Sequence, residues 1–423
     1  MHTRSSKRQK LCIIPTTRSW AKANSTVLRL QSHLRKTCET HERDTNNPGI
    51  APLLEAKVTF EPLILNLSSI LDVEKAAKEF EESLAERGGK LDVLIANAGT
   101  GGYTGVDWFG LVKQLVTEGP LAVLSRPKFK RSSVGAVTAR QMLPHQEDHT
   151  QSRASSNANE KTAKEEEEPP LGDVFCANVF GHYLLGHWLS PALTRAASGR
   201  MIWVSSLEAY AYALNLNDLQ GLTTPISYES SKRLTDLLVL TSGLPSTQPY
   251  VDSYFGIAPS PETPNPRRPK FYVSHPGICV TPIVPLHPVI VAMQVVLIYV
   301  ARLLGSYWHT LTAWSGATAP VWLALASSAM LDEMEENEGK GKWGSVVNSW
   351  GRERVVRTEV TGWGFGGRIG ETRPKVGRWD LWVNDEERLK EFEGLGRECW
   401  ARMEGLRVEW ETRIKRVGVE EVD

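Results

Sequence analysis

Two residues one helical turn apart, Tyr228 and Lys232, have the spacing of a proton-transfer pair. A free tyrosine, with a pKa of about 10, is a poor acid–base catalyst near neutrality. An ammonium on the same helix face stabilises the phenolate and brings that pKa towards the working pH. Ser206, which follows the apolar run 201–204, can hold a substrate carbonyl against the phenol. The pattern predicts ketone/alcohol chemistry, although Tyr-x3-Lys alone also fits a solvated i,i+4 pair.

Three further motifs, in chain order, favour a catalytic role for Tyr228 and Lys232 over a solvated pair. Residues 91–99 form a buried-strand run that ends in a small-residue turn, Asn178 opens an apolar helix, and residues 275–281 follow another apolar strand. Together with the Ser, Tyr and Lys, they resemble the short-chain dehydrogenase/reductase family from about residue 11 to about residue 330. The resemblance implies a Rossmann-like, doubly wound α/β fold.

Composition excludes several other classes. Among the 423 residues, Lys+Arg and Asp+Glu number 49 each, so the net charge is zero and no basic footprint for nucleic acid is visible. The five cysteines lack the spacing of a zinc site or disulfide framework, and they indicate reduced thiols in a cytosol-facing protein without a metal. The basic N-terminus lacks the apolar core of a signal peptide.

Strands and helices alternate in the first hundred residues. We expect strands over 11–17, 62–69 and 91–96, with helices over 19–37 and 73–87 between them. Such alternation predicts a parallel sheet covered on both faces.

The family begins with a strand, a Gly-rich turn and a helix whose N-terminus holds the cofactor pyrophosphate. The ten polar residues that precede Leu11 are too few to contain that unit. The sequence therefore predicts a family member without its first βα unit, with a gap in the sheet where the absent strand would lie. We expect this to weaken cofactor binding and activity.

The domain organisation follows from shifts in composition. Residues 125–170 are polar and densely charged, which predicts disorder, and residues 331–423 end in a helix with an apolar stripe. We therefore predict two parts, a reductase domain over 1–330 and a C-terminal extension over 331–423. The reductase domain contains a disordered insertion at about 125–170, a loop insertion at about 244–268 and an apolar flap at about 282–305. The extension contains an amphipathic helix at about 385–415.

The longest apolar stretch, residues 289–301, allows two interpretations. It is shorter than the roughly 20 residues that span a bilayer, and a buried core helix would explain it. Prolines precede it and it follows a strand end, where ligands bind in open α/β sheets. We therefore favour a hydrophobic flap that lines a lipid-binding site and touches the membrane.

Within the family, the sequence is most similar to the 3-keto-sterol reductases of sterol C-4 demethylation, a group that includes fungal ergosterol-pathway enzymes and vertebrate 17β-hydroxysteroid dehydrogenase type 7. The resemblance implies reduction of a 3-ketone on a 4-methyl-sterol by NADPH. Tyr228 would donate the proton, Lys232 would lower its pKa and hold the ribose, Ser206 (in place of its neighbour Ser205) would bind the carbonyl, and Asn178 would anchor a relay water.

The resemblance also implies a cofactor site. Asn66 and Cys279 depart from the residues that are usual in the family, an acid and a valine, and Arg18 is placed to select the 2′-phosphate. The implied cofactor contacts are Thr17, Arg18, Asn66, Asn97, Gly99, Cys279 and Thr281, together with Tyr228 and Lys232.

The implied partners are a sterol, other C-4 demethylation enzymes and, peripherally, the cytosolic face of the endoplasmic reticulum membrane or the lipid droplet surface. Two alternatives stay open. One is a different lipid-directed reductase, acting on retinoids or acyl ketones. The other is a non-catalytic remnant that serves as a scaffold for sterol enzymes.

Overall fold

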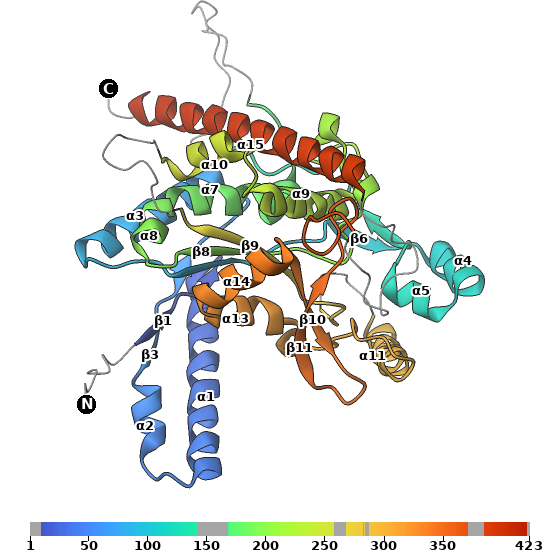
Figure 1. Cartoon of the computed structure of the whole chain (residues 1–423), viewed down its shortest axis with the longest axis horizontal. Coiled ribbons are helices and arrows are strands. Elements are labelled where there is room, and N and C mark those ends of the chain that lie inside the picture. The colour runs from blue at the N-terminus through green and yellow to red at the C-terminus, as the bar shows by residue number, and fades with distance from the viewer. Residues whose placement is uncertain are drawn as a thin grey trace, which may run out of the picture.

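The core of the fold is a five-stranded sheet in the order β11-β10-β9-β8-β5, in a computed structural model that describes residues 10–141, 168–257, 268–281, 283, 287–370 and 385–420 (Figure 1). The four strands from β5 to β10 run parallel, and β11 is antiparallel to β10. All five residues of β8 are buried, as the apolar run 201–204 predicts. The strand bounds are β5 Val93–Ala96, β8 Arg200–Val204, β9 Lys270–His275, β10 Lys342–Val347 and β11 Glu353–Thr358.

Helices cover both faces of this sheet, which confirms the predicted doubly wound α/β fold (Figure 1). α13 packs on β8, β9, β10 and β11 from one face, and α9 packs on β9 from the other. On the α9 face lie α3 Ile70–Glu86, α6 Asp173–Phe175, the π-helical turn η1 Cys176–Phe180, α7 Gly181–Trp188, α8 Ser190–Arg195, α9 Ser227–Thr241 and α10 Gln248–Phe255. The opposite face carries α12 Ala313–Gly316, α13 Thr318–Leu325 and α14 Ser328–Glu338.

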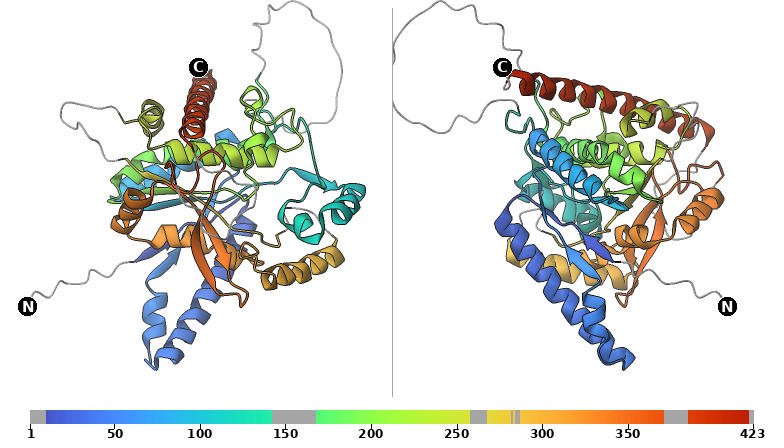
Figure 2. Two further views of the ribbon diagram at one scale, coloured as in Figure 1. Left: turned by 45° about the vertical axis from the view of Figure 1, so that its right-hand side comes forward. Right: turned by 90° about the vertical axis from the view of Figure 1, so that its left-hand side faces the viewer.

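The N-terminal strands form two small parallel pairs beside this sheet. β1 Leu11–Ile13 pairs with β3 Val58–Phe60, and β2 Thr16–Thr17 pairs with β4 Leu63–Ile64. Within the described residues, neither pair hydrogen-bonds to β5, so the interruption that the sequence predicts is present. α1 Trp20–Thr45, longer than expected, and α2 Ile50–Glu55 project away from the sheet (Figures 1 and 2).

Two segments that we expected to be irregular contain regular structure. β7 Lys130–Ser132 pairs antiparallel with β6 Tyr103–Val106, so the expected disorder at 125–170 is wrong for its first part, because long-range pairing offsets the cost of ordering a polar strand. α10 likewise lies within the loop expected over 244–268. Residues 142–167 and 258–267 lie outside the described part. The neighbouring elements are α4 Trp108–Glu118, α5 Pro120–Ser125, and the 3₁₀ turns η2 Ala211–Ala213 and η3 Leu216–Asp218.

The C-terminal segment adds both strands and a helix to the fold. β10 and β11, which sequence analysis missed, extend the central sheet. α15 Glu386–Glu420 lies over α9 (Figure 2), and the predicted apolar stripe is its docking face. Trp400 at its centre is 1% exposed, and its indole N–H donates to Leu238 O of α9 at 3.0 Å.

Candidate active site

Ser206 and Tyr228 meet at the carboxyl end of the sheet. Ser206 follows β8, its Oγ accepts from the Glu208 N–H at 3.1 Å, and it hydrogen-bonds to the Tyr228 side chain. Ser205 turns the other way and donates to Lys232 O at 3.2 Å. The structure therefore brings Ser206, rather than Ser205, to the phenol.

The pKa of Tyr228 is raised above its ordinary value, which corrects the expectation that Lys232 would lower it. Burial is the main cause, the charges of Glu208 and Glu229 add to it, and the hydrogen bond with Ser206 opposes it. At neutral pH the side chain is therefore a phenol that can donate a proton.

Lys232 is buried one turn further along α9. Its Nζ lies 5.6 Å from the centroid of the Tyr228 ring and donates to Val204 O at 2.8 Å. The pKa of this ammonium is lowered to about 8: burial is the main cause, the charge of Lys342 acts in the same direction, and the charge of Asp236 opposes both. Lys342 of β10 forms an ion pair with Asp236 at 2.6 Å, and both side chains are buried.

Asn178 lies in the π-helical turn η1, a local irregularity that is frequent at functional sites. Its Oδ1 accepts from Thr100 N at 2.7 Å, and its Nδ2 donates to Thr100 O at 2.9 Å and to Ser231 Oγ at 3.1 Å. The amide thus joins the loop after β5 to α9, and both of its donors are used within the protein. Its part in a water relay stays a prediction.

The predicted cofactor residues fall into three groups, each at a strand end. Thr17 ends β2 and Arg18 follows it; Leu65 N donates to Thr17 O, so Asn66 lies just beyond the end of the adjacent strand β4. Asn97 and Gly99, both exposed, follow β5. Cys279 and Thr281 follow β9; the Cys279 Sγ lies 3.0 Å from Thr310 Oγ1, and Thr281 is exposed.

The residues around Lys232 fit the ribose and nicotinamide end of a dinucleotide. An ammonium has three donors, and the hydrogen bond to Val204 O uses one, which leaves donors for ribose hydroxyls. Gly99 lies against Asn178, where a Cβ would come within 2.6 Å of the amide oxygen, so this loop presents backbone without a side chain. A group of three or more metal-ligating side chains does not occur among the described residues.

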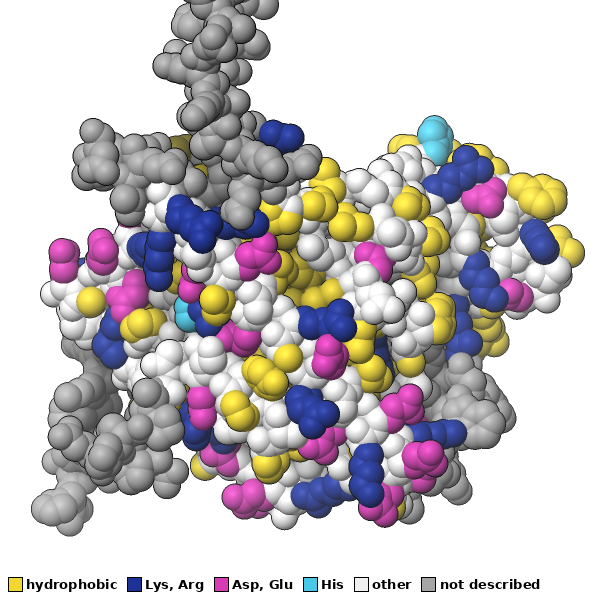
Figure 3. Space-filling model, turned by 90° about the horizontal axis from the view of Figure 1, so that it is seen from above, with side chains coloured by type: hydrophobic (Ala, Val, Ile, Leu, Met, Phe, Trp, Pro, Cys, Tyr) yellow, Lys and Arg dark blue, Asp and Glu magenta, His cyan; other side chains and the backbone are white. Residues whose placement is uncertain are grey.

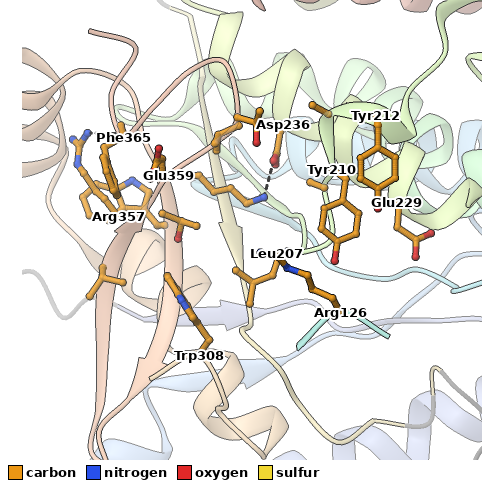
Figure 4. A pocket seen from close by; sticks show the side chains of 18 of the residues that line it. Arg126, Leu207, Tyr210, Tyr212, Glu229, Asp236, Trp308, Arg357, Glu359 and Phe365 are labelled. Carbon is orange, nitrogen blue, oxygen red and sulfur yellow. Dashed lines mark hydrogen bonds and ion pairs between the residues drawn. The ribbon is translucent and has the colours of Figure 1, made fainter. Parts of the chain in front are cut away.

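A large cavity of about 1450 Å³ lies near the candidate active site (Figure 4). Its lining includes Leu207, Ile226 and Glu229, which neighbour Ser206 and Tyr228 in the chain, whereas Ser206, Tyr228 and Lys232 are not themselves among the lining residues. Aromatic side chains contribute much of the wall, among them Tyr210, Tyr212, Trp308 and Phe365, and the dashed line at Asp236 marks its ion pair with Lys342. The volume exceeds the roughly 300–1,000 Å³ of most small-molecule sites, so a bulky ligand fits.

Sequence analysis missed several charged residues near this cavity, namely Lys130, Glu208, Glu229, Asp236 and Lys342. Glu229 and Asp236 carried the clearest available signal, since they are acidic residues on a helix that is otherwise buried. Lys130 and Lys342 lie about a hundred residues before and after this helix in the chain, so no local pattern signals their approach.

An apolar surface lies near the cavity mouth. The predicted flap is helix α11 Pro288–Leu303, which contacts α5, whereas residues 282 and 284–286 lie outside the described part. Val296 is 61% exposed, Leu303 76% and, on neighbouring α4, Phe109 81%, while Ile298 is buried. Figure 3 shows hydrophobic side chains in the hollowed middle of one face and on the lobe beside it. None of the helices in the described residues has both the length and the hydropathy needed to cross a membrane.

A Ser, a Tyr and a Lys at the carboxyl end of a doubly wound parallel sheet define an oxidoreductase of the short-chain dehydrogenase/reductase class, which interconverts C=O and CH–OH groups. The chain is 40% identical to the 3-keto-steroid reductase erg27 of Aspergillus fumigatus, over 96% of this chain and 87% of the relative. It is 33% identical to ERG27 of Gibberella zeae, over 96% and 88%, and 29% identical to erg27 of Schizosaccharomyces pombe, over 72% and 73%. No family model matches the chain. The chain belongs to the 3-keto-steroid reductase family, which confirms the predicted resemblance.

Proposed function

We propose that this protein reduces the 3-keto group of a 4-methyl-sterol intermediate in sterol (ergosterol) biosynthesis with NADPH. The observation that carries the proposal is the convergence of Ser206, Tyr228 and Lys232, whose chain neighbours Leu207 and Glu229 line a cavity large enough for a bulky lipid. The names of the relatives, 3-keto-steroid reductases, support the substrate class.

The chain's own residues divide the work between them. Ser206 hydrogen-bonds the substrate carbonyl oxygen, and Tyr228 gives that oxygen its proton. Lys232 binds ribose hydroxyls, and Arg18, at the exposed end of β2, binds the 2′-phosphate. When bound, the reduced nicotinamide supplies a hydride to the carbonyl carbon.

The exposed apolar faces of α11 and α4 support peripheral membrane contact. The protein would then meet its sterol at the cytosolic face of the endoplasmic reticulum membrane or a lipid droplet, beside the other C-4 demethylation enzymes. A sterol leaving the bilayer would enter the cavity near Arg126 and Lys128, the lining residues that follow α5.

The test is turnover of a 3-keto-4-methyl-sterol in detergent micelles by the purified chain and by Tyr228→Phe. We expect NADPH-dependent formation of the 3-hydroxy product that Tyr228→Phe almost abolishes, with unchanged circular dichroism. Equal turnover in both proteins would refute the role of Tyr228. No turnover by the folded, unaltered chain would refute the proposed activity.

A further inference from the structure

Four side chains form a buried polar cluster against Tyr228 that the proposed mechanism does not use. Lys130 Nζ lies 2.8 Å from carboxylate oxygens of both Glu208 and Glu229 and 2.7 Å from Tyr103 Oη. The same Nζ lies 5.7 Å from the centroid of the Tyr228 ring. The members come from β6, β7, the segment after β8 and α9, so the folded structure alone brings them together.

The cluster carries more negative than positive charge. The side chains of Lys130 and Glu229 are only 6% and 7% exposed, and that of Glu208 is 19% exposed. One ammonium and two carboxylates give a formal charge of −1. Glu229 Oε2 is buried without a hydrogen-bond partner, so part of that charge is not offset by local contacts. Buried charge of this kind costs stability, which suggests that the arrangement serves a purpose other than folding.

The cluster dominates the electrostatic surroundings of the phenol. Four elements other than α9, together with the segment after β8, contribute ionisable groups to this region. The ionisable and charged groups near Tyr228 are Tyr103 of β6, Lys130 of β7, Glu208 after β8, Tyr212 of η2, Glu229 and Lys232 of α9 and, through their effect on Lys232, Asp236 of α9 and Lys342 of β10.

We propose that Glu208 and Glu229, tied together by Lys130, are positioning residues that keep the Tyr228 hydroxyl protonated and so extend carbonyl reduction to more alkaline pH. Reduction consumes the phenolic proton: the Tyr228 O–H bond breaks, a new O–H bond forms on the substrate oxygen, and a phenolate is left on Tyr228. That phenolate takes up a proton from solvent before the next turnover, and two nearby carboxylates favour the protonated form. Both carboxylates raise the pKa of Tyr228, in agreement with this geometry. The effect on reduction rests on the proposed function, whereas the effect on the Tyr228 proton does not.

The first experiment needs neither cofactor nor turnover. The protein is labelled with ¹³C at the tyrosine Cζ, the Tyr228 resonance is identified by its loss in Tyr228→Phe, and it is titrated with base. Glu229→Gln keeps the shape of the side chain and removes one charge, so we expect the Tyr228 titration to move down by roughly one pH unit. Glu208→Gln should move it in the same direction, and Glu86→Gln, on the exposed end of α3, should leave it in place.

The second experiment measures the pH dependence of turnover. For Glu229→Gln, we expect the alkaline limb of kcat/KM for reduction to shift to lower pH. A Tyr228 titration that is identical in Glu229→Gln, Glu208→Gln and the unaltered protein would overturn the inference even if the protein proves to be an active reductase. A shifted titration in a protein without turnover would support the electrostatic effect and refute only the proposed function.

Discussion

Replacing Lys232 by methionine should change how the stability of the fold depends on pH. Lys232 is 6% exposed, and folding lowers its pKa from 10.5 to about 8, chiefly through burial. A lysine with a lowered folded-state pKa costs stability where both states are protonated, that is, below about pH 8. Between about pH 8 and pH 10.5, Lys232 is still protonated in the unfolded chain but has lost its proton in the folded state. The free energy of unfolding of the unaltered protein therefore rises with pH across this window.

The size of the effect follows from the width of that window. Each pH unit within the window adds about 1.4 kcal/mol to the free energy of unfolding, so the whole window should add on the order of 3 kcal/mol. Methionine keeps much of the side-chain volume and carries no charge, so Lys232→Met should lack this gain. Loss of the hydrogen bond to Val204 O adds an offset that does not vary with pH.

The assay is urea unfolding of the unaltered protein and of Lys232→Met at a series of pH values from about 7 to about 10. We expect the variant's free energy of unfolding, relative to the unaltered protein, to fall by about 1.4 kcal/mol per pH unit above pH 8. Lys75→Met, at an exposed position of α3, is the matched control and should show a constant difference. A constant difference for Lys232→Met as well would mean that Lys232 stays protonated throughout, which would refute the reasoning.

Three further predictions test other parts of the molecule. Arg18→Ala should raise KM for NADPH much more than KM for NADH, because it removes one charge-assisted phosphate contact; equal increases would place Arg18 outside the cofactor site. Replacing Val296 and Leu303, both exposed on α11, by Ser should release the protein from lipid vesicles in a flotation assay, and flotation that is unchanged would show that this face does not bind lipid. Trp400→Ala should lower the free energy of unfolding by about 3–5 kcal/mol, measured in urea, whereas Trp400→Phe should cost nearer 1 kcal/mol through the lost bond to Leu238 O. A small effect of Trp400→Ala would mean that α15 docks only weakly.

The sequence predicts those features that depend on local periodicity. The apolar strand 201–204, the Tyr-x3-Lys helix and the stripe of α15 all appear where the residue pattern places them. Each is a single element whose buried face is defined by residues close together in the chain. Elements that become ordered only by pairing with a distant segment are not predicted by local periodicity. β7 lies in a polar segment that reads as disordered, and it forms a strand because β6 pairs with it.

The sign of the Tyr228 pKa shift shows the same limit at the level of chemistry. The i,i+4 spacing brings Lys232 near Tyr228, and from spacing alone a lowered pKa follows. In the structure, the Lys232 ammonium donates to Val204 O, while the charges of Glu208 and Glu229 raise the pKa of the phenol. Glu208 is about twenty residues upstream of Tyr228 in sequence, and no local pattern reports that it approaches.

The C-terminal segment has a closer connection to the site than its place in the sequence suggests. Lys342 of β10 donates to Ser206 O at 2.6 Å and to Ser205 Oγ at 3.2 Å, and it pairs with Asp236 on α9. One buried ammonium thus joins the loop that carries Ser206 to the helix that carries Tyr228, and it also depresses the pKa of Lys232. β10 reaches this position only because it pairs with β9. The strands that follow residue 330 therefore position the reacting groups, so the geometry of the candidate active site depends on both halves of the chain.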